Sequence, residues 1–184
     1  MDPTDRLPGI RPQPSFWRRL DMAARTCFPG FFTALLMVLS VAPLGLAHQA
    51  VLLAALAVGS VYFWSLARPA SMPSALVFLL GLLLDVLGFL PLGVGPLCLL
   101  LTHAVALRYR LGLCMQPFLL IWLVFAGVAG CAALLQWALV SLLLFRITPP
   151  TLAAFQWVIA VGLYPAIAGA FARTNRSIAD PQRA

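Results

Sequence analysis

Long runs of apolar residues, interrupted by short groups of Pro, Gly and Arg, fill the sequence from residue 28 to residue 172. Because a helix rises about 1.5 Å per residue and must cross about 30 Å of hydrocarbon, such runs predict membrane-spanning helices. The pattern predicts an all-α integral membrane protein with short loops and a six-helix membrane domain over residues 28–172. The six expected helices cover about residues 28–47, 50–67, 73–89, 94–109, 118–145 and 151–172.

The third and fourth expected helices are short, and a tight run containing Pro and Gly separates them at residues 88–93. Residues 73–109 therefore form either two full crossings or a re-entrant pair, and the pattern leaves both open. Pro43 and Pro165 fall inside expected helices. They should bend them, because proline lacks a backbone N–H and clashes with the preceding turn.

The composition narrows the class of protein. Hydrophobic residues make up 62% of the chain and charged residues 9%, whereas soluble domains carry roughly 25% charge. This excludes a soluble globule and, for most of the chain, disorder. All twelve basic residues are Arg, and only Arg146 falls on the opposite side from the two tails in the alternating topology. The positive-inside rule then predicts a multi-pass membrane protein with both termini cytoplasmic.

The two tails differ in pattern. Residues 1–14 hold four Pro and no apolar period, which predicts a disordered cytoplasmic tail. Residues 15–27 place apolar residues on one helical face and Arg on the other. They form either an interfacial amphipathic helix or a charged segment that only sets the topology. Residues 173–184 predict a second cytoplasmic tail. Because the basic residues flank membrane helices and form no patch, nucleic-acid binding is not expected.

Asp85 is the only acidic residue inside an apolar run. A charged residue there costs about 2.5–3.5 kcal/mol on insertion scales, so it marks a candidate site. Asp85 either accepts hydrogen bonds from the backbone of the turn at residues 88–95 and fixes that turn, or takes part in transport or catalysis. His103, Gln136 and Gln156 are expected to form hydrogen bonds between helices.

Small residues recur in the last two expected helices, at Gly127 and Gly130 in the fifth and at Gly162 and Ala166 in the sixth. Small residues at helical spacing allow helices to approach closely. These faces serve either packing within the bundle or contact with the helix of a partner.

Several aromatic residues fall near the expected cytoplasmic ends of the helices. Trp and Tyr are enriched at membrane–water interfaces, where an apolar ring and a polar group are both accommodated. The positions predict interface anchors at Trp17, Tyr62, Trp64, Tyr109 and Trp122.

No set of residues points to catalysis. An intramembrane aspartyl enzyme needs two carboxyl groups, one as acid and one as base, and only Asp85 is present. Ser60 and the distant His103 form no recognisable nucleophile and base. The four Cys have no metal-binding spacing. We therefore expect no enzyme activity, no metal and no cofactor.

Two motifs between residues 62 and 95 resemble the MreD family of bacterial rod shape-determining membrane proteins. The first is an aromatic group followed by Leu-Ala-x-Pro, and the second is Gly-x-x-x-Asp followed by a Leu-Gly turn. Together they span about a fifth of the chain. The long N-terminal tail with its Arg and Pro residues departs from the family pattern. The matching residues are Tyr62, Phe63, Trp64, Leu66, Ala67 and Pro69, and then Gly81, Asp85, Pro91, Leu92 and Gly93.

The resemblance implies a non-enzymatic adaptor or scaffold of the cell-wall elongation complex, which supports rod shape and lateral peptidoglycan synthesis. The partners it implies are MreC, RodA, the elongation-specific penicillin-binding transpeptidase and the filament protein MreB. Contacts are expected at the Asp85–Gly93 turn and at the small-residue faces of the last two helices. The alternative is a small-molecule binding subunit of a vitamin-type uptake transporter. Such a subunit needs a polar pocket, for which the outer half offers little beyond Asp85 and Gln156.

Overall fold

The computed structural model describes residues 16–41, 49–113, 115–146 and 148–179, and within these ranges it describes side chains from residue 28 to residue 173. This part of the chain is all-helical and contains no strand, which confirms the all-α part of the expected fold class. Its elements are α1 (Phe16–Ser40), α2 (Gln49–Ala67), the short 3₁₀ helix η1 (Pro69–Ser71), α3 (Ser74–Gly88), α4 (Val94–Leu113), α5 (Phe118–Leu143) and α6 (Thr151–Ala179).

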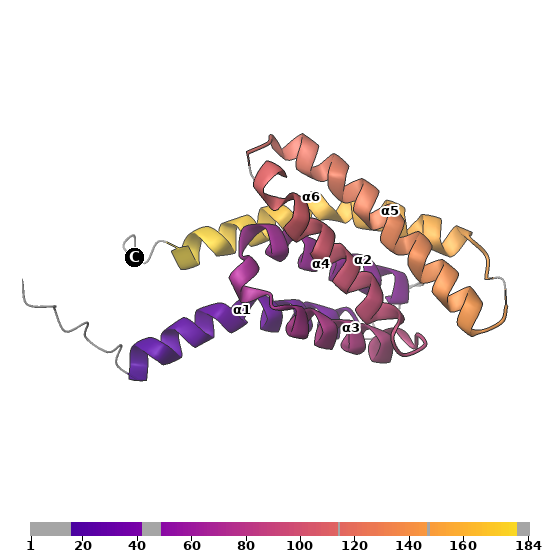
Figure 1. Ribbon diagram of the computed structural model, residues 1–184, viewed down its shortest axis with the longest axis horizontal. Coiled ribbons are helices and arrows are strands. Elements are labelled where there is room, and N and C mark those ends of the chain that lie inside the picture. Colours follow the sequence, from indigo (N-terminus) through magenta and orange to yellow (C-terminus); the bar gives the residue numbers. More distant parts are fainter. Residues whose placement is uncertain (1–15, 42–48, 114, 147, 180–184) are drawn as a thin grey trace, which may run out of the picture.

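Successive helices run in alternating directions along the long axis of the molecule (Figure 1). The start of α1, the α2–α3 connection, the α4–α5 connection and the end of α6 lie at one end. The α3–α4 turn and the α5–α6 connection lie at the other end. Arg68 follows α2 and Arg110 is in the last turn of α4, both at the first end, whereas Arg146 follows α5 at the second. The helices thus separate these Arg side chains as the charge pattern predicts.

Among the described residues, three helices have the length and apolar composition needed to cross a membrane, which indicates a membrane protein. They are α2, α5 and the Thr151–Arg173 part of α6. Two further apolar stretches are shorter, in α1 over Phe28–Ser40 and in α3. With 15 residues, α3 is only about 22 Å long. A straight α3 therefore falls short of the roughly 30 Å of a hydrocarbon core.

The ends of two helices differ from the expected boundaries. α1 is one continuous helix with Pro29 inside it, so residues 16–27 and the stretch from residue 28 onward belong to the same helix. The side chains of residues 16–27 lie outside the description, as do the tail over residues 1–14 and Pro43. α6 continues through Pro165 to Ala179, past the expected end at residue 172.

α2 is the central helix of the bundle. It contacts each of the other five α-helices. In its most apolar stretch 67% of the residues are buried, compared with 22% in α5 and 33% in α6. A helix that is apolar on all sides can be covered in this way. The expectation that Tyr62 and Trp64 are interface anchors is wrong, because both side chains are 0% exposed. They pack against rings of the neighbouring helices, with centroid distances of 5.1 Å from Tyr62 to Phe125 and from Trp64 to Phe171.

Candidate functional site

The carboxyl group of Asp85 joins α3 to the start of α4. Its side chain is 1% exposed. Oδ2 accepts a hydrogen bond from the backbone N–H of Gly93 at 2.7 Å, and Oδ1 accepts one from the backbone N–H of Gly95 at 2.6 Å. The first N–H groups of a helix have no partner within that helix, and a side-chain oxygen can satisfy them. The predicted hydrogen bonds from the turn to Asp85 are therefore present.

The turn between the two helices has two residues with positive φ. Phe89 ends α3 in the left-handed conformation with φ 52°, and Gly93 has φ 104°. The N–H groups of Phe89 and Leu90 both donate to the carbonyl of Asp85, the latter at 3.0 Å. Such bonds satisfy carbonyls at a helix end. Asp85 thus accepts bonds at its backbone and its side chain, and Gly93 supplies a conformation that other residues rarely adopt.

Close backbone contact between α3 and α4 depends on two glycines. A Cβ atom at Gly81 would overlap Cα and N of Pro96, and one at Gly95 would overlap the carbonyl oxygen of Gly81. The structure therefore brings Gly81, Asp85 and Gly93 of the second motif together with Gly95 and Pro96. The sequence analysis missed that Gly95 and Pro96 lie against Gly81. The run Gly93-Val94-Gly95-Pro96 was a signal, because small residues at the start of a helix allow another backbone to approach.

His103 makes the expected bond between helices. Its ring Nδ1 lies 2.7 Å from the hydroxyl of Ser65 on α2, and both side chains are buried. The Ser65 hydroxyl donates to the carbonyl of Val61 at 2.6 Å. Because a hydroxyl carries one hydrogen, His103 must be the donor to Ser65. Asp85 and His103 therefore have separate hydrogen-bond partners.

Two indole N–H groups connect α5 and α6 in opposite directions. Trp122 on α5 donates to the carbonyl of Val161 at 2.9 Å, and Trp157 on α6 donates to the carbonyl of Ala126 at 2.8 Å. Proline at position 165 has no N–H to give to Val161, four residues earlier, so Trp122 satisfies the carbonyl that proline leaves free. Trp122 therefore connects two helices rather than only anchoring at the interface.

The small residues of α5 and α6 divide into two groups. Gly130 lies under Trp157, where an added Cβ would come 3.3 Å from the indole nitrogen. Gly127, Gly162 and Ala166 are exposed, and an added Cβ at either glycine would meet no atom within 4 Å. The prediction that these small residues pack inside the bundle is thus confirmed for Gly130. It is wrong for the other three residues, which face outward.

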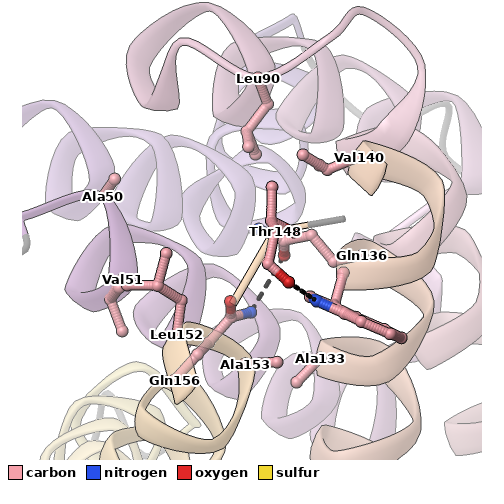
Figure 2. A pocket seen from close by; sticks show the side chains of 11 residues that line it. Ala50, Val51, Leu90, Ala133, Gln136, Val140, Thr148, Leu152, Ala153 and Gln156 are labelled. Atoms are coloured by element: carbon pink, nitrogen blue, oxygen red, sulfur yellow. Dashed lines mark hydrogen bonds between the residues drawn. The ribbon is translucent and has the colours of Figure 1, made fainter. Parts of the chain in front are cut away.

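A cavity of about 250 Å³ lies at the end of α5 and the start of α6. Gln156 and Gln136 meet in its lining, where the amide Nε2 of Gln156 donates to Oε1 of Gln136 at 3.0 Å (Figure 2). This is the expected bond between the two helices. Gln156 thus belongs to a pocket, whereas Asp85 is absent from its lining.

Among the residues that the structure describes, no three His, Cys, Asp or Glu side chains are grouped closely enough to hold a metal ion. Comparisons with protein-family models, curated proteins and solved structures found no match to this chain. The contacts and exposed faces of the helices themselves are therefore the basis for assigning a function.

Proposed function

We propose that the chain is a multi-pass protein of the bacterial inner membrane, that its six helices each cross the bilayer, and that both termini are cytoplasmic. The alternating helix directions and the separation of Arg68 and Arg110 from Arg146 support this topology. The short α3 is compatible with it because Asp85 satisfies N–H groups of the α3–α4 turn, which hydrocarbon would otherwise leave unpaired.

Cysteine labelling in intact cells tests this topology. Ala70, Leu92 and Phe145 are exposed positions in three different connections. In a chain whose own Cys are replaced by Ala, cysteine at position 92 or 145 should react with a membrane-impermeant maleimide from outside. Cysteine at position 70 should react only after permeabilisation. Protection of position 92 from the outside would show that α3 and α4 form a re-entrant pair.

We further propose that the protein is an adaptor or scaffold of the cell-wall elongation complex, of the kind represented by the MreD family that residues 62–95 resemble. The observation that carries this proposal is the outward position of Gly127, Gly162 and Ala166. In a bilayer, apolar side chains gain little from leaving lipid, so helices associate through close packing at small residues. Open glycines on two adjacent helices are suited to a partner's membrane helix.

The resemblance supplies the identity of the partners in this proposal. Single-span MreC, RodA and the elongation-specific penicillin-binding transpeptidase all bring membrane helices, and MreB brings a cytoplasmic filament. The α5 and α6 faces would receive one of these helices. The α3–α4 hairpin would keep the bundle rigid, because its polar groups are already paired within the chain.

Co-purification from a rod-shaped bacterium, followed by mass spectrometry, tests the proposal. Elongation proteins should co-purify with the wild-type chain, and its depletion should round the cells while uptake of small molecules stays normal. Replacing Gly127 and Gly162 together by Leu should reduce co-purification several-fold, because the added side chains hold a partner helix away. Ala104→Leu is the matched control, since Ala104 is a small exposed residue on α4.

The result that would contradict the adaptor role is equally direct. If the Gly127 and Gly162 double variant recovers the same partners in the same amounts as Ala104→Leu, the outward glycines are lipid-facing only. If no elongation protein co-purifies with the wild-type chain, the proposed complex is wrong.

A further inference from the structure

The cavity between α2, α5 and α6 has a lining without any charged side chain. It is partly open and is bordered by the start of α2, the last turns of α5, the first turns of α6 and the turn after α3 (Figure 2). Most of the lining atoms belong to apolar side chains. The lining residues are Ala50, Val51, Leu90, Ala133, Gln136, Trp137, Val140, Thr148, Leu152, Ala153 and Gln156.

The two glutamine amides in this lining have hydrogen-bonding capacity that the chain does not use. Gln156 is 7% exposed, and its amide gives one N–H to Oε1 of Gln136. Within the described part of the chain, Oε1 of Gln156 and Nε2 of Gln136 have no hydrogen-bond partner. Turning both amides over would exchange the roles and again leave one amide oxygen and one whole NH₂ group outside the pair. Both residues line the cavity, so these amide groups are available to a molecule bound there.

The other polar groups at this end of the cavity are already paired. The indole N–H of Trp137 donates to the carbonyl of Thr148 at 2.8 Å. The hydroxyl oxygens of Thr148 and Ser141 lie 2.8 Å apart and share a hydrogen bond. Most of the free capacity of the lining therefore lies at the glutamine pair, which offers an amide oxygen as acceptor and an NH₂ group as donor.

We propose that this cavity binds a small uncharged molecule that has an apolar body and one carboxamide or lactam group. The amide of such a ligand donates to Gln156 and accepts from Gln136, while its body contacts the apolar walls. A charged ligand is excluded, because no opposite charge lines the cavity to offset the loss of hydration. With about 250 Å³, the cavity is smaller than the roughly 300 Å³ at which drug-sized pockets begin, so a single ring fits. This inference does not depend on the adaptor role.

Ligand-observed ¹⁹F NMR on the full chain in lipid nanodiscs tests this site, with 4-fluorobenzamide as the probe. 4-Fluorobenzoate has the same ring with a charge, and 4-fluorotoluene has the same ring without a hydrogen-bonding group. We expect saturable binding of the amide and binding of the other two weaker by about tenfold or more. Empty nanodiscs supply the background from partition into lipid.

Three variants separate the glutamine contact from general apolar binding. Gln156→Leu should weaken binding of 4-fluorobenzamide about tenfold and leave 4-fluorotoluene unchanged, because only the amide uses Gln156. Ala50→Phe should weaken both compounds, since Ala50 is an exposed lining position that a large ring would block. Gln116→Leu is the matched control, because Gln116 is exposed in the α4–α5 connection, away from the cavity.

Two outcomes would overturn the proposal. If 4-fluorobenzamide shows no saturable signal above that of empty nanodiscs, the cavity holds only water or a lipid chain. If it binds equally to the wild type and to Ala50→Phe, the compound binds outside the cavity. If it binds equally to the wild type and to Gln156→Leu, it makes no hydrogen bond to the glutamine amides. Gln136→Leu provides the same comparison should Gln156→Leu fail to fold.

Discussion

The two helices of the α3–α4 hairpin are held together by a carboxyl group and by direct backbone contact. The helices α5 and α6 are held together by hydrogen bonds from neutral side chains. In the hairpin, both oxygens of Asp85 accept backbone N–H groups and Gly81 lies directly against Pro96. In the α5–α6 pair, two indoles reach across to carbonyls and two glutamines share one hydrogen bond.

The two pairs also differ in what they leave unused. The hairpin pairs the oxygens of its acidic side chain internally and tolerates no added atom at Gly81. The α5–α6 pair exposes Gly127 and Gly162 and keeps an amide donor and an acceptor free beside a cavity. A rigid structural element and an element suited to binding thus lie side by side in one bundle. Mutations should therefore affect the hairpin through stability and the α5–α6 pair through binding.

The largest effect is expected where backbone lies against backbone. Gly81→Ala should destabilise the protein by about 3 kcal/mol, because its Cβ would overlap main-chain atoms of Pro96 that cannot rotate away. Gly127→Ala is the matched change in α5 and should be neutral or stabilising by up to about 1 kcal/mol. Unfolding in mixed detergent measures both. Equal stabilities of the two variants would show that the helix pairs do not differ in packing.

Asp85→Ala should destabilise the protein by about 2 kcal/mol, because the N–H groups of Gly93 and Gly95 would lose their acceptor in a buried site. Asp85→Asn keeps one acceptor oxygen and should lose less. The same unfolding assay measures both variants, and cell width and partner recovery give the functional readout. If Asp85→Ala leaves cell width, co-purification and protein level unchanged, Asp85 has no special role in the hairpin.

Gln156→Leu should cost about 1 kcal/mol, because it leaves the Gln136 amide without its partner. Replacing both glutamines by Leu should restore most of that loss, since an apolar pair needs no hydrogen bond. A double-mutant cycle of unfolding free energies measures this coupling. Additive losses would mean that the two amides do not interact.

The smallest effect is expected for the indole bonds. Trp122→Phe should cost about 0.6 kcal/mol, a typical value for a hydrogen bond between membrane helices, because Pro165 leaves the Val161 carbonyl without another donor. Trp157→Phe should cost less, since the Ala126 carbonyl keeps the helical N–H of Gly130. Unfolding midpoints of the two variants give the comparison. A larger loss for Trp157→Phe would contradict the role assigned to Pro165.

Several hydrogen bonds of the candidate site could be predicted from the types of residue in the apolar stretches. A single acid in an apolar run must find donors, and the nearest backbone N–H groups are those of the turn that follows it, so the role of Asp85 was predictable. The partners of His103 and Gln156 were predictable as a class, because buried polar groups in membrane helices bond across helices. Which atoms they meet depends on how the helices pack, and Ser65 gave no signal of its own.

The outward position of Gly162 and the burial of Tyr62 were not predictable in this way. Hydropathy distinguishes apolar from polar residues, but lipid and protein interior are both apolar surroundings. The same periodicity therefore fits a face that meets lipid, a face that meets a partner and a face that meets another helix of the chain.

By itself, the sequence determined that the described chain is helical, which of its stretches are apolar and where its Arg residues lie between helices. It also indicated that Asp85 would need hydrogen-bond partners inside the apolar bundle. Only the tertiary structure decided that α2 is central, that Gly81 touches Pro96 and that Gln136 and Gln156 share a cavity. The reason is physical: helix formation depends on local residue pattern, whereas helix contacts depend on the shapes of surfaces far apart in the chain.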